Sequence, residues 1–206
     1  DLMGASPGAM ALCIDHGVKL SFLSPSGRFI GSLEGAIKGN VLLRRAQYNM
    51  SEDELLSTHL GSLFIGGKIA NHRSILRRFL RDHHPDETIT EEIENAICLL
   101  KRELGMLPHQ HTRLEIMGVE GYSANIYFGV FKHLILNPEF QFEKRSKRPP
   151  KDEVNALLSF FYTLLAHDVR AALETVGLDA YVGFLHTDRP GRPSLALDLM
   201  EELRGY

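Results

Sequence analysis

The spacing of apolar residues changes near residue 39 of this 206-residue chain. Before it, short runs at 18–23 and 28–33 predict two strands, and the Ser-Pro-Ser-Gly sequence at 24–27 favours a turn between them. A helix is predicted over 7–16, ending at Gly17. After residue 39, apolar positions recur at helical spacing almost to the end. We therefore expect an α+β fold, mostly α, with the remainder of a small β-rich N-terminal domain over 1–38 and an all-helical domain over 39–206.

The helical part is predicted to contain several long helices and one short one. Ser51 and Glu54 have the spacing of a capping box, which would start a long helix reaching about residue 81. Further helices are expected over 90–104, 113–136 and 151–176. Pro193 and Ser194 are expected to begin the short helix near the end of the chain.

Glu120 is the most unusual residue of the predicted helices. On a helical wheel over 113–136 it lies in the middle of an apolar face that includes Ile116 and Tyr127. A glutamate is rarely buried unless it is paired or bound to metal, because a desolvated carboxylate is costly. The pattern therefore indicates either an ion pair with arginine or lysine, or a metal ligand. Gly118 and Gly121 beside it would admit a ligand or another backbone, or mark helix packing.

A histidine and three carboxylates lie close together in the sequence near its end. His186 closes an apolar run, and a Pro/Gly-rich loop leads to the short helix that carries Asp198, Glu201 and Glu202. Imidazole and carboxylate groups are ligands of divalent cations. Taken alone, the stretch also fits a core histidine and a solvated helix face. Together with Glu120 it predicts a metal site, although periodicity does not choose among the three carboxylates.

Composition limits the class of protein. The chain has 23 Lys and Arg against 26 Asp and Glu, so no global cationic field indicates a nucleic-acid partner. Cys13 and Cys98 lack metal or redox spacing, which fits a reducing compartment. No apolar run approaches the ~20 residues that span a bilayer, and no signal peptide opens the chain. We expect a cytoplasmic protein with no membrane partner.

Positive charge is nevertheless concentrated in two places. Arg73, Arg77, Arg78 and Arg81 recur on one helix face, and the loop at 143–151 holds five cations against one anion. Such clusters bind the phosphate backbone of DNA, although each alone also fits a solvated surface. The candidate DNA-binding residues are Arg73, Arg77, Lys144, Arg145, Lys147 and Arg148.

Five motifs carry a family resemblance: Ser6–Leu12 (SPGAMAL), Gly67–Arg73 (GKIANHR), Glu120–Asn125 (EGYSAN), Lys147–Pro150 with Asn155–Phe160, and Gly183–Asp188 (GFLHTD) continuing through Glu201. Together they resemble the Cas-one family of CRISPR-associated adaptation endonucleases and integrases, closely the type I-C form. The resemblance covers essentially the whole chain. Family members are longer at both ends, so we expect a truncated β domain and a truncated C-terminal end.

The resemblance implies a metal-dependent DNA endonuclease and integrase, which inserts new spacer DNA into a CRISPR array by phosphoryl transfer at DNA ends. It implies Mg²⁺ or Mn²⁺ held by Glu120, His186 and Glu201, with Asp198 as a further catalytic residue. The implied partners are double-stranded DNA, a second copy in a homodimer, the small Cas-two protein and a Cas-four nuclease.

Two alternatives stay open. His167-Asp168 and His83-His84 are residue types of an HD-type metal phosphohydrolase, for which Glu120 would be dispensable. The other alternative is a non-catalytic DNA-binding scaffold in which Glu120 forms a structural ion pair.

Overall fold

The computed structural model describes residues 4–25, 29–33, 35 and 40–205. Its N-terminal elements are α1 (Pro7–Asp15), β1 (Leu20–Leu23) and β2 (Phe29–Leu33), and the two strands pair antiparallel. Gly17, which follows α1, has a φ of 67°, the left-handed conformation in which glycine commonly ends a helix. The helix and both strands are thus confirmed within one or two residues. Part of the predicted turn at 24–27 and the boundary at Gly39 lie outside the described residues.

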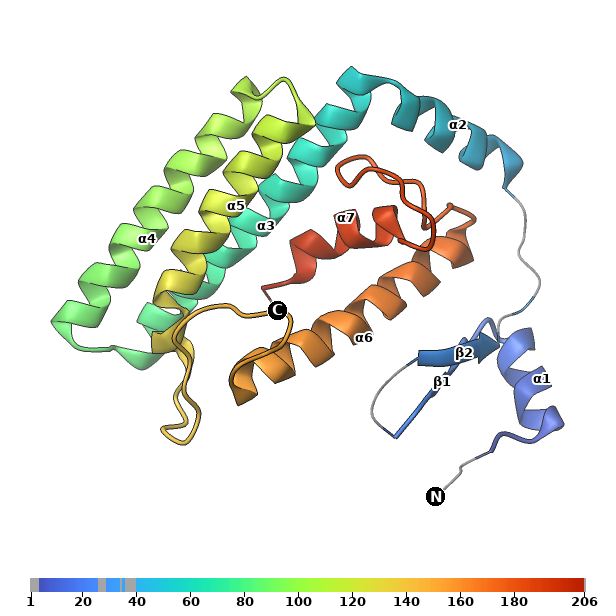
Figure 1. Ribbon diagram of the computed structural model, residues 1–206, viewed down its shortest axis with the longest axis horizontal. Coiled ribbons are helices and arrows are strands. Elements are labelled where there is room, and N and C mark those ends of the chain that lie inside the picture. The colour runs from blue at the N-terminus through green and yellow to red at the C-terminus, as the bar shows by residue number, and fades with distance from the viewer. Residues whose placement is uncertain (1–3, 26–28, 34, 36–39, 206) are drawn as a thin grey trace.

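The remaining regular elements of the described chain are all helices, which confirms the mostly-α class. The elements are α2 (Val41–Glu52), α3 (Glu54–His83), α4 (Glu87–Met106), η1 (Leu107–His109), α5 (Arg113–Val130), η2 (Phe131–Leu134), α6 (Glu153–Val176) and α7 (Ser194–Leu203). α3, α4 and α5 lie side by side, and the short α7 lies between α3 and α6 (Figure 1). This arrangement places the end of the described chain against the longest helix.

The predicted capping box at Ser51 is wrong. The Asp53 carboxylate accepts the first backbone N–H groups of α3 at 2.9 and 3.0 Å, so Asp53 is the N-cap. The Ser51 hydroxyl instead donates to the carbonyl of Tyr48 at 2.8 Å, inside α2. Aspartate caps a helix as well as serine does, so the sequence offered two caps within three residues.

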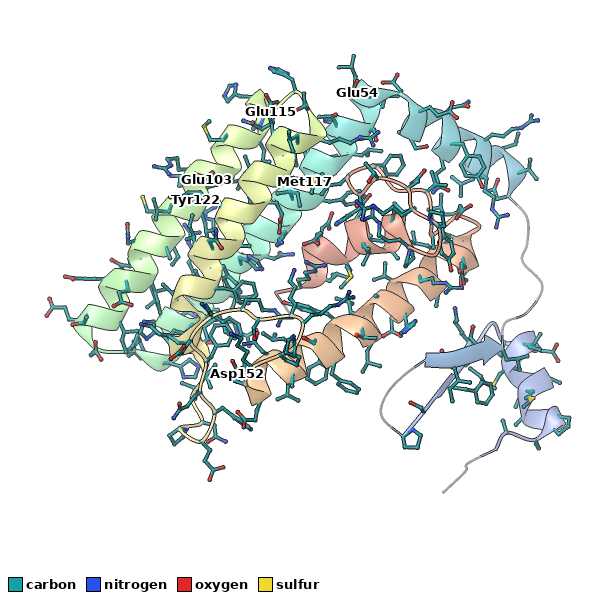
Figure 2. All side chains as sticks on the ribbon, viewed as in Figure 1. Glu54, Glu103, Glu115, Met117, Tyr122 and Asp152 are labelled. Carbon is teal, nitrogen blue, oxygen red and sulfur yellow. The ribbon has the colours of Figure 1, made fainter. Side chains whose placement is uncertain are left out.

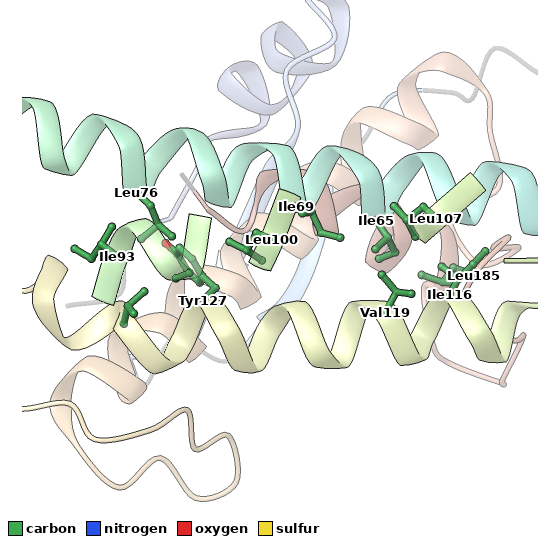
Figure 3. Close-up of a cluster of buried hydrophobic side chains, with 12 residues drawn as sticks. Ile65, Ile69, Leu76, Ile93, Leu100, Leu107, Ile116, Val119, Tyr127 and Leu185 are labelled. Carbon is green, nitrogen blue, oxygen red and sulfur yellow. The ribbon is translucent and has the colours of Figure 1, made fainter. Parts of the chain in front are cut away.

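The main hydrophobic core lies between α3, α4 and α5 (Figure 3). A second buried cluster joins α7 to α6, with Leu195 and Met200 packed near Val169 and Leu173. Each fully buried side chain of this kind contributes about 1.5–3 kcal/mol. Because α7 is held on both sides, the residues it presents to α3 have fixed positions. The core residues labelled in Figure 3 are Ile65, Ile69, Leu76, Ile93, Leu100, Leu107, Ile116, Val119, Tyr127 and Leu185.

One described helix, α6, is long and apolar enough to cross a membrane by length and composition. The expectation that no apolar run approaches this length is therefore corrected. Two faces of α6 are apolar, which explains the composition. One face packs on α7, and the other carries Leu157, Phe160 and Phe161, which are exposed.

Candidate metal centre and nucleic-acid interface

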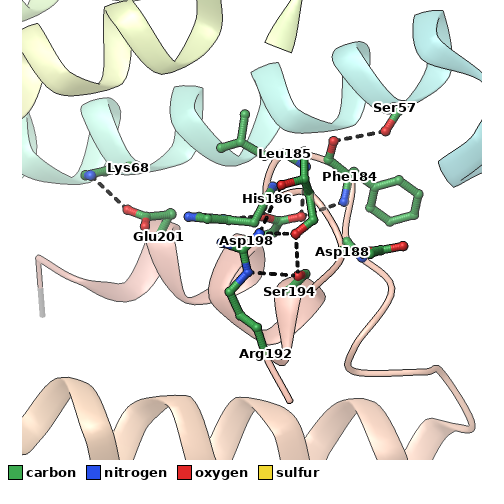
Figure 4. A network of polar contacts seen from close by, with 12 residues as sticks. Ser57, Lys68, Phe184, Leu185, His186, Asp188, Arg192, Ser194, Asp198 and Glu201 are labelled. Carbon is green, nitrogen blue, oxygen red and sulfur yellow. Dashed lines mark hydrogen bonds and ion pairs between the residues drawn. The ribbon is translucent and has the colours of Figure 1, made fainter. Parts of the chain in front are cut away.

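A buried lysine joins the two carboxylates that the sequence singled out on different helices. Lys68 of α3 is 3% exposed. Its ammonium contacts Glu120 Oε1 of α5 and, at 2.8 Å, Glu201 Oε2 of α7 (Figure 4 shows Lys68 and Glu201). The other oxygen of Glu201 accepts from Arg204 Nη1 at 2.8 Å. The carboxylates of α5 and α7 therefore converge on one desolvated cation.

Asp198 fixes the orientation of His186. The Asp198 side chain is fully buried, and it accepts the backbone N–H groups of Phe184, Leu185 and His186 at 2.6, 2.9 and 2.9 Å. Its Oδ1 is also 2.6 Å from His186 Nδ1. A carboxylate on one ring nitrogen sets the tautomer and leaves the other nitrogen for a ligand. In Figure 4 the free end of the His186 ring points in the direction of Glu201 and Lys68.

Two glycines allow the loop and α7 to approach this closely. A Cβ on Gly183 would lie 2.7 Å from Ser194 Cβ and 2.8 Å from Asp198 Oδ2, so no other residue fits there. A Cβ on Gly67 of α3 would lie 2.8 Å from Glu202 Cγ. Glycine is needed at Gly183, whereas a side chain at Gly67 would require the flexible Glu202 side chain to move.

The three carboxylates of α7 make different contacts in the structure. Asp198 is saturated by four donors, so it holds the histidine, whereas Glu201 reaches the shared cation. Glu202 lies over Gly67, and burial raises the pKa of its carboxyl group. Glu201 is therefore the carboxylate of α7 that lies beside Glu120.

The helical-wheel placement of Glu120 is corrected. The buried face of α5 runs through Ile116, Val119 and Tyr127, and Glu120 lies at its edge with a 27% exposed side chain. Met117, an apolar residue of α5 that is labelled in Figure 2, is exposed. The wheel misplaced the face because it counted every apolar residue, including those that face solvent. A Cβ on Gly118 or Gly121 would meet no atom within 4 Å among the described residues, so no other described part of the chain packs closely on these glycines.

Sequence reasoning missed Lys68 and Arg204. The buried face of α3 contains Ile65, Ile69 and Leu76, and Lys68 lies among them. A lysine in the middle of an apolar stripe is the same signal that made Glu120 conspicuous, with the opposite charge. Reading the two signals together would have predicted their pairing.

The predicted DNA-binding residues differ in how exposed they are. Arg77, Lys144, Lys147 and Arg148 are exposed. Arg73 is half-buried, and burial, with the nearby Arg77, lowers the pKa of its guanidinium. Because most of the predicted DNA-binding residues are exposed, these residues remain candidates for contacts with phosphate.

Arg145 is held within the protein. Its Nη1 donates to Asn155 Oδ1 and to the carbonyl of Ser146, each at 2.7 Å. Asn155 is itself fully buried and ties the loop to the first turn of α6. Arg145 therefore has a fixed guanidinium, unlike the exposed cations of the same loop.

The His83-His84 and His167-Asp168 motifs lie in different surroundings. His83, at the end of α3, lines a cavity of about 600 Å³ together with Arg78 and Asp82. His167 is on α6, where burial, then Arg170, lower the pKa of its imidazole. His83 and His167 lie on different helices, and His167 is not among the residues that line the cavity at His83, which gives no support to a shared HD-type site.

The donor set suits a divalent ion, but its members are not arranged around one point. Among the described residues, no group of three or more His, Cys, Asp and Glu side chains is placed to hold a metal. The cation that Glu120 and Glu201 share is the Lys68 ammonium. Two carboxylates with an oriented imidazole match the preferences of Mn²⁺ and Mg²⁺. The residues thus fit such an ion, provided that the Lys68 ammonium moves away from Glu120 and Glu201 when the ion binds.

A helical protein with carboxylates and an oriented histidine at one site belongs among candidate divalent-metal enzymes. The family model described as "CRISPR associated protein Cas1" matches residues 2–206. The chain belongs to the Cas1 family.

Curated relatives carry the same description. The chain is 48% identical over 206 residues to CRISPR-associated endonuclease Cas1 1 of Chlorobaculum tepidum, covering 99% of the chain and 60% of the relative. It is 50% identical to CRISPR-associated endonuclease Cas1 2 of Rhodospirillum rubrum, covering 97% and 58%. A CRISPR-associated exonuclease Cas4/endonuclease Cas1 fusion of Rhodospirillum rubrum is 36% identical over 91% of the chain and 32% of the relative. The chain spans about 60% of the length of the first two.

Solved structures share the fold. A casposase bound to integration product matches with a TM-score of 0.79 and 28% identity, over 97% of this chain and 54% of that one. A Cas6-RT-Cas1–Cas2 complex matches with a TM-score of 0.72 and 25% identity, over 97% and 21%. The likeness therefore extends over almost the whole chain.

Proposed function

We propose that this protein is a divalent-metal-dependent DNA endonuclease and integrase that inserts spacer DNA into a CRISPR array. The observation that carries the proposal is the convergence of Glu120 and Glu201 on one cation position, next to a histidine oriented by Asp198. Relatives named as Cas1 endonucleases and a casposase bound to integration product support the same reaction class.

Glu120, Glu201 and His186 are proposed to hold Mg²⁺ or Mn²⁺, with the ring nitrogen of His186 that faces away from Asp198 as the third donor. When bound, such an ion polarises a phosphate and activates a water or a 3′-hydroxyl for in-line displacement. Asp198 accepts from Nδ1 of the ring, which fixes the tautomer that directs the lone pair of the other nitrogen to the ion, and it stops the ring from rotating. Arg73, Arg77, Lys144, Lys147 and Arg148 are proposed to position backbone phosphates without reading bases.

The proposed partners are double-stranded DNA, a second copy of the chain, Cas2 and Cas4. A Cas1–Cas2 assembly among the solved structures and a Cas4/Cas1 fusion among the relatives support the last two. Homodimer formation and the type I-C subtype rest on the family resemblance, and the cytoplasmic location rests on the cysteine pattern of the sequence.

The proposal is tested by comparing wild type with Glu120→Gln on linear and branched DNA in Mn²⁺. We expect loss of cutting and strand joining by at least about a hundredfold, because the change removes a ligand of the ion that the chemistry requires. DNA affinity, measured by fluorescence anisotropy, is expected to change by less than about threefold, because the phosphate-binding residues are intact.

Glu94→Gln is the matched control, since Glu94 is exposed on α4. Its activity is expected to equal that of wild type. A non-catalytic scaffold, which the Glu120–Lys68 pair would also suit, predicts no Mn²⁺-dependent chemistry in any variant. An HD-type enzyme predicts that Glu120→Gln stays active while His167→Ala does not, and either outcome would refute the proposal.

A further inference from the structure

A small pocket adjoins the candidate metal centre. It has a volume of about 40 Å³, and Lys68 and Glu120 form the wall that it shares with that centre. Arg145 and Lys147 from the loop before α6, and Arg204 from the end of α7, form other parts of its lining. About three water-sized atoms fill such a volume, which suits the oxygens of one phosphoryl group and excludes a nucleobase.

Tyr162 of α6 holds two of the cations in place. The guanidinium carbons of Arg145 and Arg204 lie 5.5 and 5.3 Å from its ring centroid, within the range of cation–π attraction. The Tyr162 hydroxyl also donates to the carbonyl of Arg204 at 3.3 Å. Asn155 and Glu201 fix the same guanidiniums from their other sides. The donors are thus preorganised before any ligand arrives.

These cations exceed the anions around the pocket. Glu120 and Glu201 offset Lys68 and Arg204, which leaves Arg145 and Lys147 without a carboxylate. Although the Lys147 residue is exposed overall, its ammonium lines the pocket and makes no hydrogen bond or ion pair within the described residues; partial desolvation, then Arg204, lower its pKa. His72 also lines the pocket, but burial lowers its pKa to about 3, so it adds no charge. A pocket with uncompensated cations favours an anion.

Part of the donor capacity is also unused. The buried Nε atoms of Arg145 and Arg204 have no hydrogen-bond partner among the described residues. A buried N–H without a partner costs free energy, so an acceptor that reached either atom after a small shift of the side chain would be favoured. Charge-assisted bonds from guanidinium to phosphate are among the stronger hydrogen bonds in proteins.

We propose that Arg145, Lys147 and Arg204, held by Tyr162, form a subsite for a single backbone phosphate of DNA adjacent to the reacting one. The inference rests on the proposed function for the nature of the ligand. It assigns Lys147 a different role from its loop neighbours Lys144 and Arg148, which do not line the pocket. By seating one phosphate, the subsite sets the distance between the bound strand and the carboxylates.

The test is a phosphate-neutralisation scan of DNA binding in EDTA, measured by fluorescence anisotropy. Each duplex carries one methylphosphonate, which removes the charge of a single phosphate. For wild type, one position is expected to weaken binding about five- to tenfold. The affinity of Lys147→Ala for unmodified DNA should be lower than that of wild type by a similar factor. A methylphosphonate at the sensitive position should then cause no further loss of affinity in this variant.

Lys144→Ala is the matched control, because Lys144 is an exposed lysine of the same loop. It is expected to weaken binding less and to retain the sensitive position. Arg204→Lys, which keeps the charge but loses the fork and the stacking, should also lose that position. Equal effects of Lys147→Ala and Lys144→Ala, or a scan without a sensitive position, would overturn the subsite. If the subsite is overturned but Mn²⁺-dependent DNA cutting persists, the proposed function stands. If one phosphate position proves sensitive but no Mn²⁺-dependent cutting or joining occurs, only the proposed function is refuted. Absence of DNA binding would refute both.

Discussion

Lys68→Met is expected to lower the free energy of unfolding by about 3 kcal/mol when divalent metal is absent. Removing one partner of a buried ion pair costs about 3–5 kcal/mol, because the remaining charge is left desolvated. The lower figure applies here, since Glu120 is 27% exposed and Glu201 keeps Arg204. Methionine resembles the lysine stem in shape, so little cavity forms. Urea unfolding in EDTA measures the change.

Mn²⁺ is expected to reverse much of that loss. Without the ammonium, Glu120 and Glu201 are free to bind the ion, and binding to the folded state alone stabilises it. The rise in Tm on adding Mn²⁺ should therefore be larger for Lys68→Met than for wild type. Lys101→Met, at an exposed position of α4, is the control and should stay within about 0.5 kcal/mol of wild type. This account of Lys68 would be contradicted if Lys68→Met were as stable as wild type in EDTA. It would also be contradicted if Mn²⁺ raised the Tm of the two proteins equally.

Asp198→Asn is expected to cost about 3 kcal/mol of stability and to remove activity. The Asp198 carboxylate accepts three backbone N–H groups and faces His186 Nδ1. An amide has one acceptor oxygen, so its NH₂ group would oppose donors in a fully buried place. Hydrogen bonds to charged groups contribute about 1.5–3 kcal/mol, and an unsatisfied buried donor costs about 1–3 kcal/mol.

The measurement is urea unfolding together with the ¹⁵N chemical shifts of the His186 ring, which report its tautomer. Asp188→Asn is the matched control, because Asp188 is exposed and makes one long contact, at 3.3 Å from the Gly183 N–H. It should change stability by less than about 0.5 kcal/mol. An unchanged His186 tautomer in Asp198→Asn would show that Asp198 does not orient the ring.

Much of the fold follows from local pattern, because helices are specified by residues three or four positions apart. The predicted 151–176 helix, for example, is α6 with its start shifted to Glu153. The start of α3 was misplaced because two caps compete at 51–53. The predicted 113–136 helix becomes 3₁₀ from Phe131, where long-range packing of aromatic side chains, such as Phe131 on Phe142, decides the geometry.

The site was less predictable, because its contacts join residues far apart in sequence. The sequence pointed to Glu120, and the family resemblance distinguished Glu201 from Asp198. Periodicity could not do so, since both face the core on α7 and differ only in what they meet there. The pairing of Lys68 with both glutamates depends on how α3, α5 and α7 pack, which no single helical pattern contains.

The central claim is that Glu120, His186 and Glu201 bind one divalent ion. Its most direct test is a calorimetric Mn²⁺ titration of wild type, Glu201→Gln and Glu202→Gln, three proteins that differ at adjacent positions of one helix. We expect one site in wild type and in Glu202→Gln, and loss of that site, or at least a tenfold weaker one, in Glu201→Gln. Mn²⁺ binding that is unchanged in Glu201→Gln, or lost equally in both variants, would contradict the claim.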